Sequence, residues 1–107
     1  MADTLSILAG PAQAASGTST IFTVPSAHTY TVKYISLINM AHTPTTVELG
    51  INGVGNSNIF FPLVELYPYG AIAEYSGLLV FPATYTMQIQ VSQASAITYT
   101  VHGIDQG

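Results

Sequence analysis

A two-residue alternation of apolar and polar side chains returns along this chain and most constrains its fold. It is clearest at residues 84–91, where Tyr, Met, Ile and Val alternate with Thr and Gln. Successive side chains of a β-strand point to opposite faces, so the pattern predicts a strand with one buried face. The same pattern returns at residues 97–102, after a short turn at 92–95. We predict that these two strands pair as an antiparallel hairpin.

Shorter apolar runs, separated by turns rich in Gly, Pro, Asn and Ser, predict the remaining strands. These runs lie at residues 5–8, 21–24, 29–38, 47–51, 59–66 and 72–80. The alternation changes phase within residues 29–38, which indicates either a β-bulge or burial on both faces. No segment has the spacing of an amphipathic helix. The predicted fold class is therefore all-β: a single-domain β-sandwich of the jelly-roll type with about eight antiparallel strands.

The 107 residues are expected to form one domain, because a chain of this length buries roughly two thirds of its unfolded surface. Cysteine is absent, so packing and backbone hydrogen bonds must hold the fold. Residues 10–19 are rich in Ala, Ser and Gly and predict a linker. We therefore expect an N-terminal arm and linker at residues 1–19 and a β-sandwich domain at residues 20–107. The first ten residues lack the basic start of a signal peptide.

Charge is scarce in this chain. One Lys and five Asp or Glu residues make up 6% of the sequence, against about 25% in typical soluble domains, and the formal net charge is −4. A single cation excludes the basic surface that nucleic acid or an anionic membrane requires. No apolar run approaches the length of a membrane span. When the polar groups of a surface are mostly uncharged, few ions must be desolvated as a partner binds. This favours self-association.

Candidate metal ligands and acid–base catalysts are few and scattered. They are His28, His42, His102, Glu48, Glu65 and Glu74. No histidine stands two residues from another histidine or a carboxylate, as convergent ligands on one strand would. The chain also lacks a nucleophile elbow and a phosphate-binding glycine loop with its Lys. We expect no catalytic residues, no metal and no cofactor, and hence no enzyme.

Aromatic residues offer the most plausible contact sites. Tyr67 and Tyr69 flank a turn proline, where exposed tyrosines stack on sugars or pack at a subunit contact. Phe60 and Phe61 are adjacent, so in a strand they face opposite sides. We expect a neighbouring subunit to bury at least one of the two phenylalanines.

Two short stretches carry a resemblance to a known family. Residues 21–32 read as a strand, a Val-Pro step, a short turn and a second strand of Thr and Val, and residues 101–104 are Val-His-Gly-Ile. In both stretches the chain resembles the small virion structural proteins of tailed bacteriophages. The likeness covers residues 20–104 as a pattern.

What the resemblance implies is a capsid decoration, or cement, protein on the exterior of a virion. Its partners would be the major capsid protein and further copies of itself, with a trimer favoured. In that role the arm at residues 1–10 adds a strand to a neighbouring subunit, and Leu5, Ile7 and Leu8 fill pockets there. Two alternatives stay open: a tail or fibre component, and a carbohydrate-binding module that uses Tyr67 and Tyr69.

Overall fold

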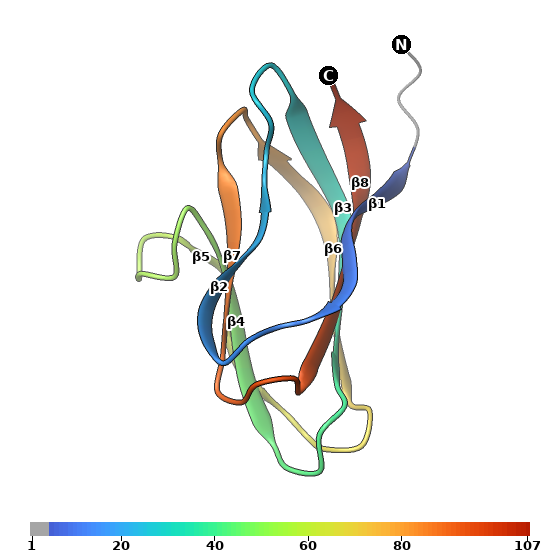
Figure 1. Cartoon of the computed structure of the whole chain (residues 1–107), viewed down its shortest axis with the longest axis vertical. Coiled ribbons are helices and arrows are strands. Elements are labelled where there is room, and N and C mark those ends of the chain that lie inside the picture. Colours follow the sequence, from blue (N-terminus) through green and yellow to red (C-terminus); the bar gives the residue numbers. More distant parts are fainter. Residues whose placement is uncertain (1–4) are drawn as a thin grey trace.

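The computed structural model describes residues 5–107, and within that range it contains strands and turns but no helix (Figure 1). No segment of this range is therefore a helix long and apolar enough to cross a membrane. The strands, in chain order, are β1 (Ser6–Gln13), β2 (Gly17–Thr23), β3 (Thr29–Asn39), β4 (Thr45–Ile51), β5 (Ile59–Leu66), β6 (Ile72–Phe81), β7 (Thr86–Val91) and β8 (Ile97–Gln106).

The strands form two four-stranded sheets that stack as two layers, in the orders β1-β8-β3-β6 and β2-β7-β4-β5 (Figure 1). Every pairing is antiparallel. The pairs β1/β8, β2/β7, β3/β6 and β4/β5 are those of one long hairpin centred on the β4–β5 loop. Rolling that hairpin brings β3 beside β8 and β4 beside β7. This is a jelly roll, and it confirms the predicted fold class.

The predicted hairpin of the last two strands is wrong. β7 lies between β2 and β4, whereas β8 lies between β1 and β3 in the other sheet. The turn between them carries the chain across the sandwich: the Ser92 amide donates to Thr46 on one side, and Ala96 accepts from Met40 on the other. Alternation reports that a strand has one buried face, and it carries no information about which strand lies beside it.

The phase change in β3 is a β-bulge, which was one of the two structures predicted. The pairing register shifts between Val32 and Tyr34 against both neighbouring strands. Against β8 the extra residue is Lys33, whereas against β6 the extra residue lies in β6, at residues 77–78. The inserted residue lets Val32 and Ile35 both point into the core, where neither has any exposed surface. Lys33 itself is exposed.

The linker predicted at residues 10–19 is also wrong. β1 continues to Gln13, β2 begins at Gly17, and both strands are paired within the sandwich. Between them Ala14 is buried and exchanges backbone hydrogen bonds with Ile97 and Ser95. Small residues here serve close packing instead of flexibility: a Cβ on Gly10, whose φ is +79°, would collide with the carbonyl oxygen of Tyr99. The first four residues of the predicted arm lie outside the described residues.

The core lies between the two sheets and is almost entirely apolar. Phe22 of β2 packs edge-on against Phe81 of β6, with ring centroids 5.1 Å apart. The side chains without exposed surface include Val32, Ile35, Val47, Leu49, Phe81, Met87, Ile89, Ile97 and Val101. Asn39 and Thr45 are the polar residues buried among the described part of the chain.

Candidate interaction surfaces

The histidines and carboxylates of the described residues are scattered over the fold. No three of these side chains come together as metal ligands within residues 5–107, and no pocket opens in the surface described. The histidines lie apart: His28 follows β2, His42 follows β3, and His102 lies within β8. What the structure offers for function is its surfaces.

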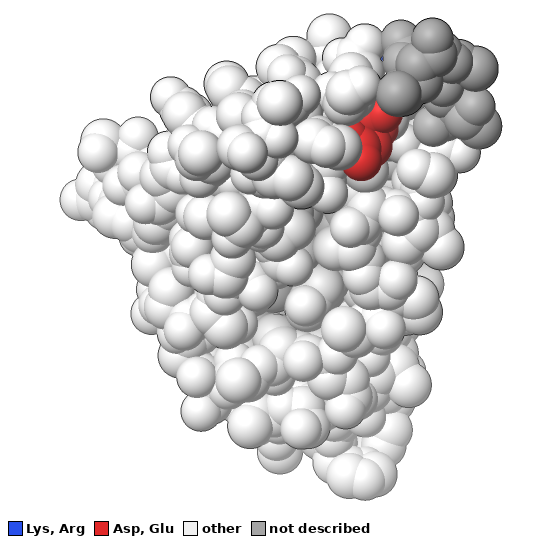
Figure 2. All heavy atoms as spheres, turned by 45° about the horizontal axis from the view of Figure 1, so that its top comes forward, with Lys and Arg blue, Asp and Glu red and all other residues white. Residues whose placement is uncertain are grey.

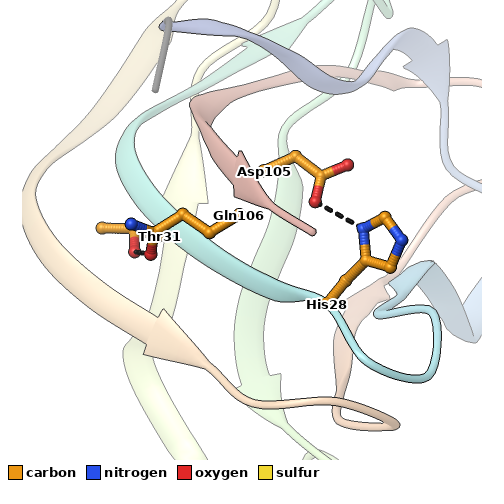
Figure 3. A network of polar contacts seen from close by, with 4 residues as sticks. All are labelled: His28, Thr31, Asp105 and Gln106. Carbon is orange, nitrogen blue, oxygen red and sulfur yellow. Dashed lines mark hydrogen bonds and ion pairs between the residues drawn. The ribbon is translucent and has the colours of Figure 1, made fainter. Parts of the chain in front are cut away.

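One polar network joins the end of β8 to the β2–β3 connection (Figure 3). His28 Nδ1 lies 2.7 Å from Asp105 Oδ1, and Thr31 lies within hydrogen-bonding distance of Gln106. Burial and the negative charge of Asp105 raise the pKa of Tyr30. The side chains of His28 and Asp105 keep 36% and 40% of their surface exposed, so their ion pair contributes at most about 1 kcal/mol. This network ties the C-terminal strand to its neighbour.

The outer face of the β1-β8-β3-β6 sheet is more apolar toward the ends of its strands and polar between them. Its middle rows place Ser36 beside Thr100 and Glu74, and Tyr34 beside His102 and Ser76. Cross-strand rows on this face run from Ile104 through Thr31 to Val80, and from Thr98 through Ile38 to Ile72. We call this surface the apolar face, and its apolar members are Ile7, Ile38, Ile72, Leu78, Val80 and Ile104. Ile7, Ile72, Leu78 and Val80 keep 54%, 60%, 63% and 55% of their surface exposed. Exposed apolar side chains gathered on one face of a sheet favour an interaction site there.

Two charged residues lie on the apolar face. Lys33 is an exposed residue of a central strand whose inner side is filled by the core, so its side chain is on the outer side. Glu74 of β6 accepts a hydrogen bond from the Tyr34 hydroxyl on the neighbouring strand. That hydrogen bond raises the pKa of Tyr34, with smaller contributions from burial and from the carboxylate charge. The apolar face therefore carries one cation and one anion, and its net charge is zero.

The outer face of the other sheet has a different composition. Its rows pair Thr18 with Gln90 and Gln90 with Glu48, and Gln88 donates to the Thr20 hydroxyl over 2.9 Å. We call this surface the polar face. Its polar members are Thr18, Thr20, Glu48, Glu65, Gln88 and Gln90, and Leu63 of β5 is an exposed apolar residue of the same sheet. Its carboxylates have no cation beside them on these strands.

Figure 2 shows a view of the molecule in which acidic side chains cover one small area and almost all other described side chains are uncharged.

A cluster of four exposed residues, three of them aromatic, lies at one end of the sandwich, and we call it the tyrosine tip. It consists of Met40, His42, Tyr67 and Tyr69. Tyr67 and Tyr69 are the most exposed large apolar side chains described, at 72% and 76%. The His42 ring meets Tyr69 edge-on at 5.3 Å.

Asn39, which has no exposed surface, holds the loops of the tyrosine tip together. Its side-chain amide donates to the carbonyls of Thr43, Leu66 and Tyr67 over 3.0, 2.9 and 3.2 Å. Its side-chain oxygen accepts from the Ala41 amide. One buried side chain thereby fixes the β3–β4 loop against the β5–β6 turn, and the exposed tyrosines stand on a rigid base.

Comparison with known proteins gives a match in fold. No family model and no curated protein matches the chain. Among solved structures it is similar to a chain in the cryo-EM structure of the virus-like particle of extra small virus (XSV) from the giant freshwater prawn Macrobrachium rosenbergii. The two chains are 14% identical, with a TM-score of 0.51, over 98% of this chain and 78% of that one. The fold is shared with a chain of a virus-like particle.

That likeness confirms the β-sandwich fold and agrees with the general expectation of a virion-type fold. It gives no specific support to tailed-phage decoration proteins, which remain a prediction. At 14% identity the likeness concerns the fold alone. Function has to be argued from the surfaces.

The seven residues predicted as contacts fall into two groups in the structure. Leu5, Ile7, Tyr67 and Tyr69 are exposed. Leu8, Phe60 and Phe61 are partly buried against the protein's own core.

The two phenylalanines do not face opposite sides as predicted. The register of β5 against β4 shifts between the pairs Leu49/Phe61 and Gly50/Ile59, which leaves Phe60 at an irregularity. Both rings consequently pack on the core, and Phe60 lies 5.7 Å from the Tyr75 ring.

Sequence reasoning missed the main part of the apolar face, at Ile72, Leu78 and Val80. A signal was present: residues 78–81 are Leu, Leu, Val and Phe, so apolar residues occupy both faces of β6. A strand with one face in the core needs apolar residues at alternate positions only. The surplus on β6 is the sequence signature of a second apolar surface.

Proposed function

We propose that this protein is a structural component of a virus particle and acts by packing against neighbouring subunits. The observation that carries the proposal is the apolar face, an exposed apolar sheet surface with no net charge on a chain whose net charge is −4. The likeness in fold to a chain of a virus-like particle supports the same role. In this role the chain performs no catalysis and needs no cofactor.

In its specific form, the proposal is a capsid decoration protein on the outside of the shell. Its partners are the major capsid protein and further copies of itself, with a trimer as the favoured oligomer. Contacts made only in the assembled particle stabilise the shell by mass action. Sparse charge suits such a role, since few ions lose water when subunits meet.

The molar ratio of this protein to the major capsid protein in purified particles tests the proposal, measured by quantitative mass spectrometry. A decoration protein is expected within a few-fold of equimolar. A few copies per particle would assign the protein to the tail or a fibre. Complete absence from particles would contradict a virion role.

Expression of the chain alone separates a decoration protein from a shell-forming one. A decoration protein forms small oligomers in isolation, whereas a shell-forming subunit produces closed particles visible by electron microscopy. Closed particles would replace the decoration role with that of the shell itself and leave the virion role intact.

A carbohydrate-binding role is the second candidate, and the tyrosine tip is the observation that favours it. Tyr67 and Tyr69 are held in place by Asn39 yet exposed, as stacking platforms for sugar rings must be. Glycan-array binding that is lost in Tyr67→Ala would support this function. Absence of binding by the unmodified chain would remove it.

A further inference from the structure

We propose that the apolar face is a two-fold interface, in which it packs against the apolar face of a second copy of this chain. The inference rests on the proposed function and adds a pairwise contact between copies, which is distinct from the contact around a three-fold axis that a trimer needs. The occupant to which we commit is a second copy. Three observations favour it: the extent of the face, its charges and the shape of its edge.

The extent of the apolar face matches what a specific contact needs. Four strands about 4.8 Å apart, with roughly nine residues each at about 3.3 Å per residue, project about 550–600 Å². Covering the whole outer face, polar rows included, buries about 1,100–1,200 Å² in the two copies together, at the boundary between weak contacts and interfaces of standard size. The exposed side chains on the outer strands, Ile7 on β1 and Ile72 and Val80 on β6, extend across the full width of this face.

The charges on the apolar face complement themselves. In a two-fold contact, residue i of one copy meets residue j of the other and the reverse. Lys33, the one cation in the sequence, and Glu74 lie on neighbouring strands of this face, so a two-fold axis between them forms two opposite-charge pairs. The same operation on the polar face would bring the carboxylates of Glu48 and Glu65 together without a cation.

The shape of β6 favours contact through the face over pairing at the edge. β6 is the outermost strand of its sheet, and its register shifts at residues 77–78, opposite the bulge at Lys33. A bulge twists an edge strand and interrupts its row of hydrogen-bonding groups, which hinders addition of a further strand. The apolar side chains of β6 remain available to a partner that stacks on the sheet.

Sedimentation equilibrium of the full chain tests the interface with a matched pair of variants. Leu78 on β6 and Leu63 on β5 are the same residue type, both on outermost strands, with 63% and 60% of their surface exposed. Leu78→Glu places a charge in the proposed interface and is expected to weaken dimerisation about 100-fold or more. Leu63→Glu, on the other sheet, is expected to change dimerisation less than about twofold.

Charge reversal tests the two-fold geometry directly. Lys33→Glu and Glu74→Lys each place like charges opposite each other and are expected to weaken dimerisation, by about fivefold to tenfold. The double variant restores opposite charges and is expected to recover most of the loss. Additive losses in the double variant would overturn the two-fold pairing.

Different results would overturn the proposed interface and the proposed function. A native chain that stays monomeric, or one in which Leu78→Glu and Leu63→Glu dimerise equally, overturns the interface, whereas copy number in particles judges the virion role. Loss of Leu78→Glu from particles while the native chain is monomeric would assign the face to another protein and likewise overturn self-pairing. If circular dichroism shows that Leu78→Glu is unfolded, Val80→Glu, at 55% exposure, takes its place under the same criteria.

Discussion

The two sheets of this sandwich have inner faces of the same kind and outer faces of different composition. Ile35 in β3 and Ile89 in β7 both have no exposed surface, so both sheets contribute to the core. Outside, one sheet presents exposed Ile, Leu and Val together with Lys33 and Glu74, and the other presents mainly Thr, Gln and Glu. Folding accounts for the inner faces. The core does not account for the difference between the outer faces, which is what the proposed interface explains.

The polar face consists mainly of side chains that water solvates well, whereas the apolar face exposes side chains that water solvates poorly. The Gln88 side-chain amide donates hydrogen bonds to the hydroxyls of Thr20 and Thr86. Ile72, Leu78 and Val80 find no such partner in water, and each leaves more than half of its surface exposed. Burial against a second subunit removes that surface from water.

The largest expected effect concerns the inner faces and tests whether the sheets are equivalent there. Ile35→Ala and Ile89→Ala each remove a fully buried side chain, and each is expected to cost about 2–5 kcal/mol of unfolding free energy. Urea denaturation measures both values. A cost below 1 kcal/mol in either variant would show that the two sheets do not share the core equally.

Asn39→Ala breaks the connection between the sheets at the tyrosine tip. The substitution leaves the buried Leu66 carbonyl of β5 without its donor from β3 and is expected to cost about 1–3 kcal/mol. Asn58→Ala serves as the control, because it removes one amide bond to Ile51 near the surface and is expected to cost about 0.5–1 kcal/mol. Equal losses in urea denaturation would contradict the special role of Asn39.

Val80→Thr sharpens the comparison of the outer faces without adding charge. The swap keeps the shape of an exposed side chain, so the unfolding free energy of the monomer is expected to change by less than about 0.5 kcal/mol. Dimerisation is expected to weaken by about threefold to tenfold, because the new hydroxyl is buried at the interface. Thr18→Val on the polar face is the mirror control, for which sedimentation should show no stronger dimer.

The smallest effect uses Tyr34 as a titrating probe of the apolar face. The hydrogen bond to Glu74 raises the pKa of Tyr34 above its ordinary 10.0, so its stabilising effect is present below pH 10 and is lost as pH rises through the folded-state pKa. Tyr34→Phe should remove a late-titrating phenol from the absorbance titration and erase this loss of stability. Dimerisation buries the phenol further, so its titration should move to higher pH as protein concentration rises. A titration independent of concentration would place Tyr34 outside the contact.

Several features of the fold were predictable because they depend on local pattern. The predicted range of β5, residues 59–66, matches the observed strand. The predicted range of β3, residues 29–38, ends one residue before the observed strand and contains the β-bulge. Pairing was not predictable, since β7 and β8 are separated by a short turn yet belong to different sheets. The linker prediction failed because composition does not separate a flexible Gly from one, such as Gly10, that packs against a carbonyl.

The candidate surfaces followed the same division. Sequence indicated exposed aromatics at Tyr67 and Tyr69, and the structure adds Asn39 as the buried residue that positions them. It could not show that Phe60 and Phe61 share a side, because that depends on an irregularity in β5 pairing. Nor could it assemble the apolar face, whose members come from strands β1, β3, β6 and β8.

By itself the sequence determined that this protein is an all-β sandwich with one core and little charge, because side-chain period and composition act within a single strand. Tertiary structure alone decided which strands are neighbours, and with that which exposed residues share a face. Lys33 and Glu74 are 41 positions apart in the chain and lie on adjacent strands of one sheet. Contacts of this kind arise from rolling the long hairpin, where each pairing depends on the pairings already formed.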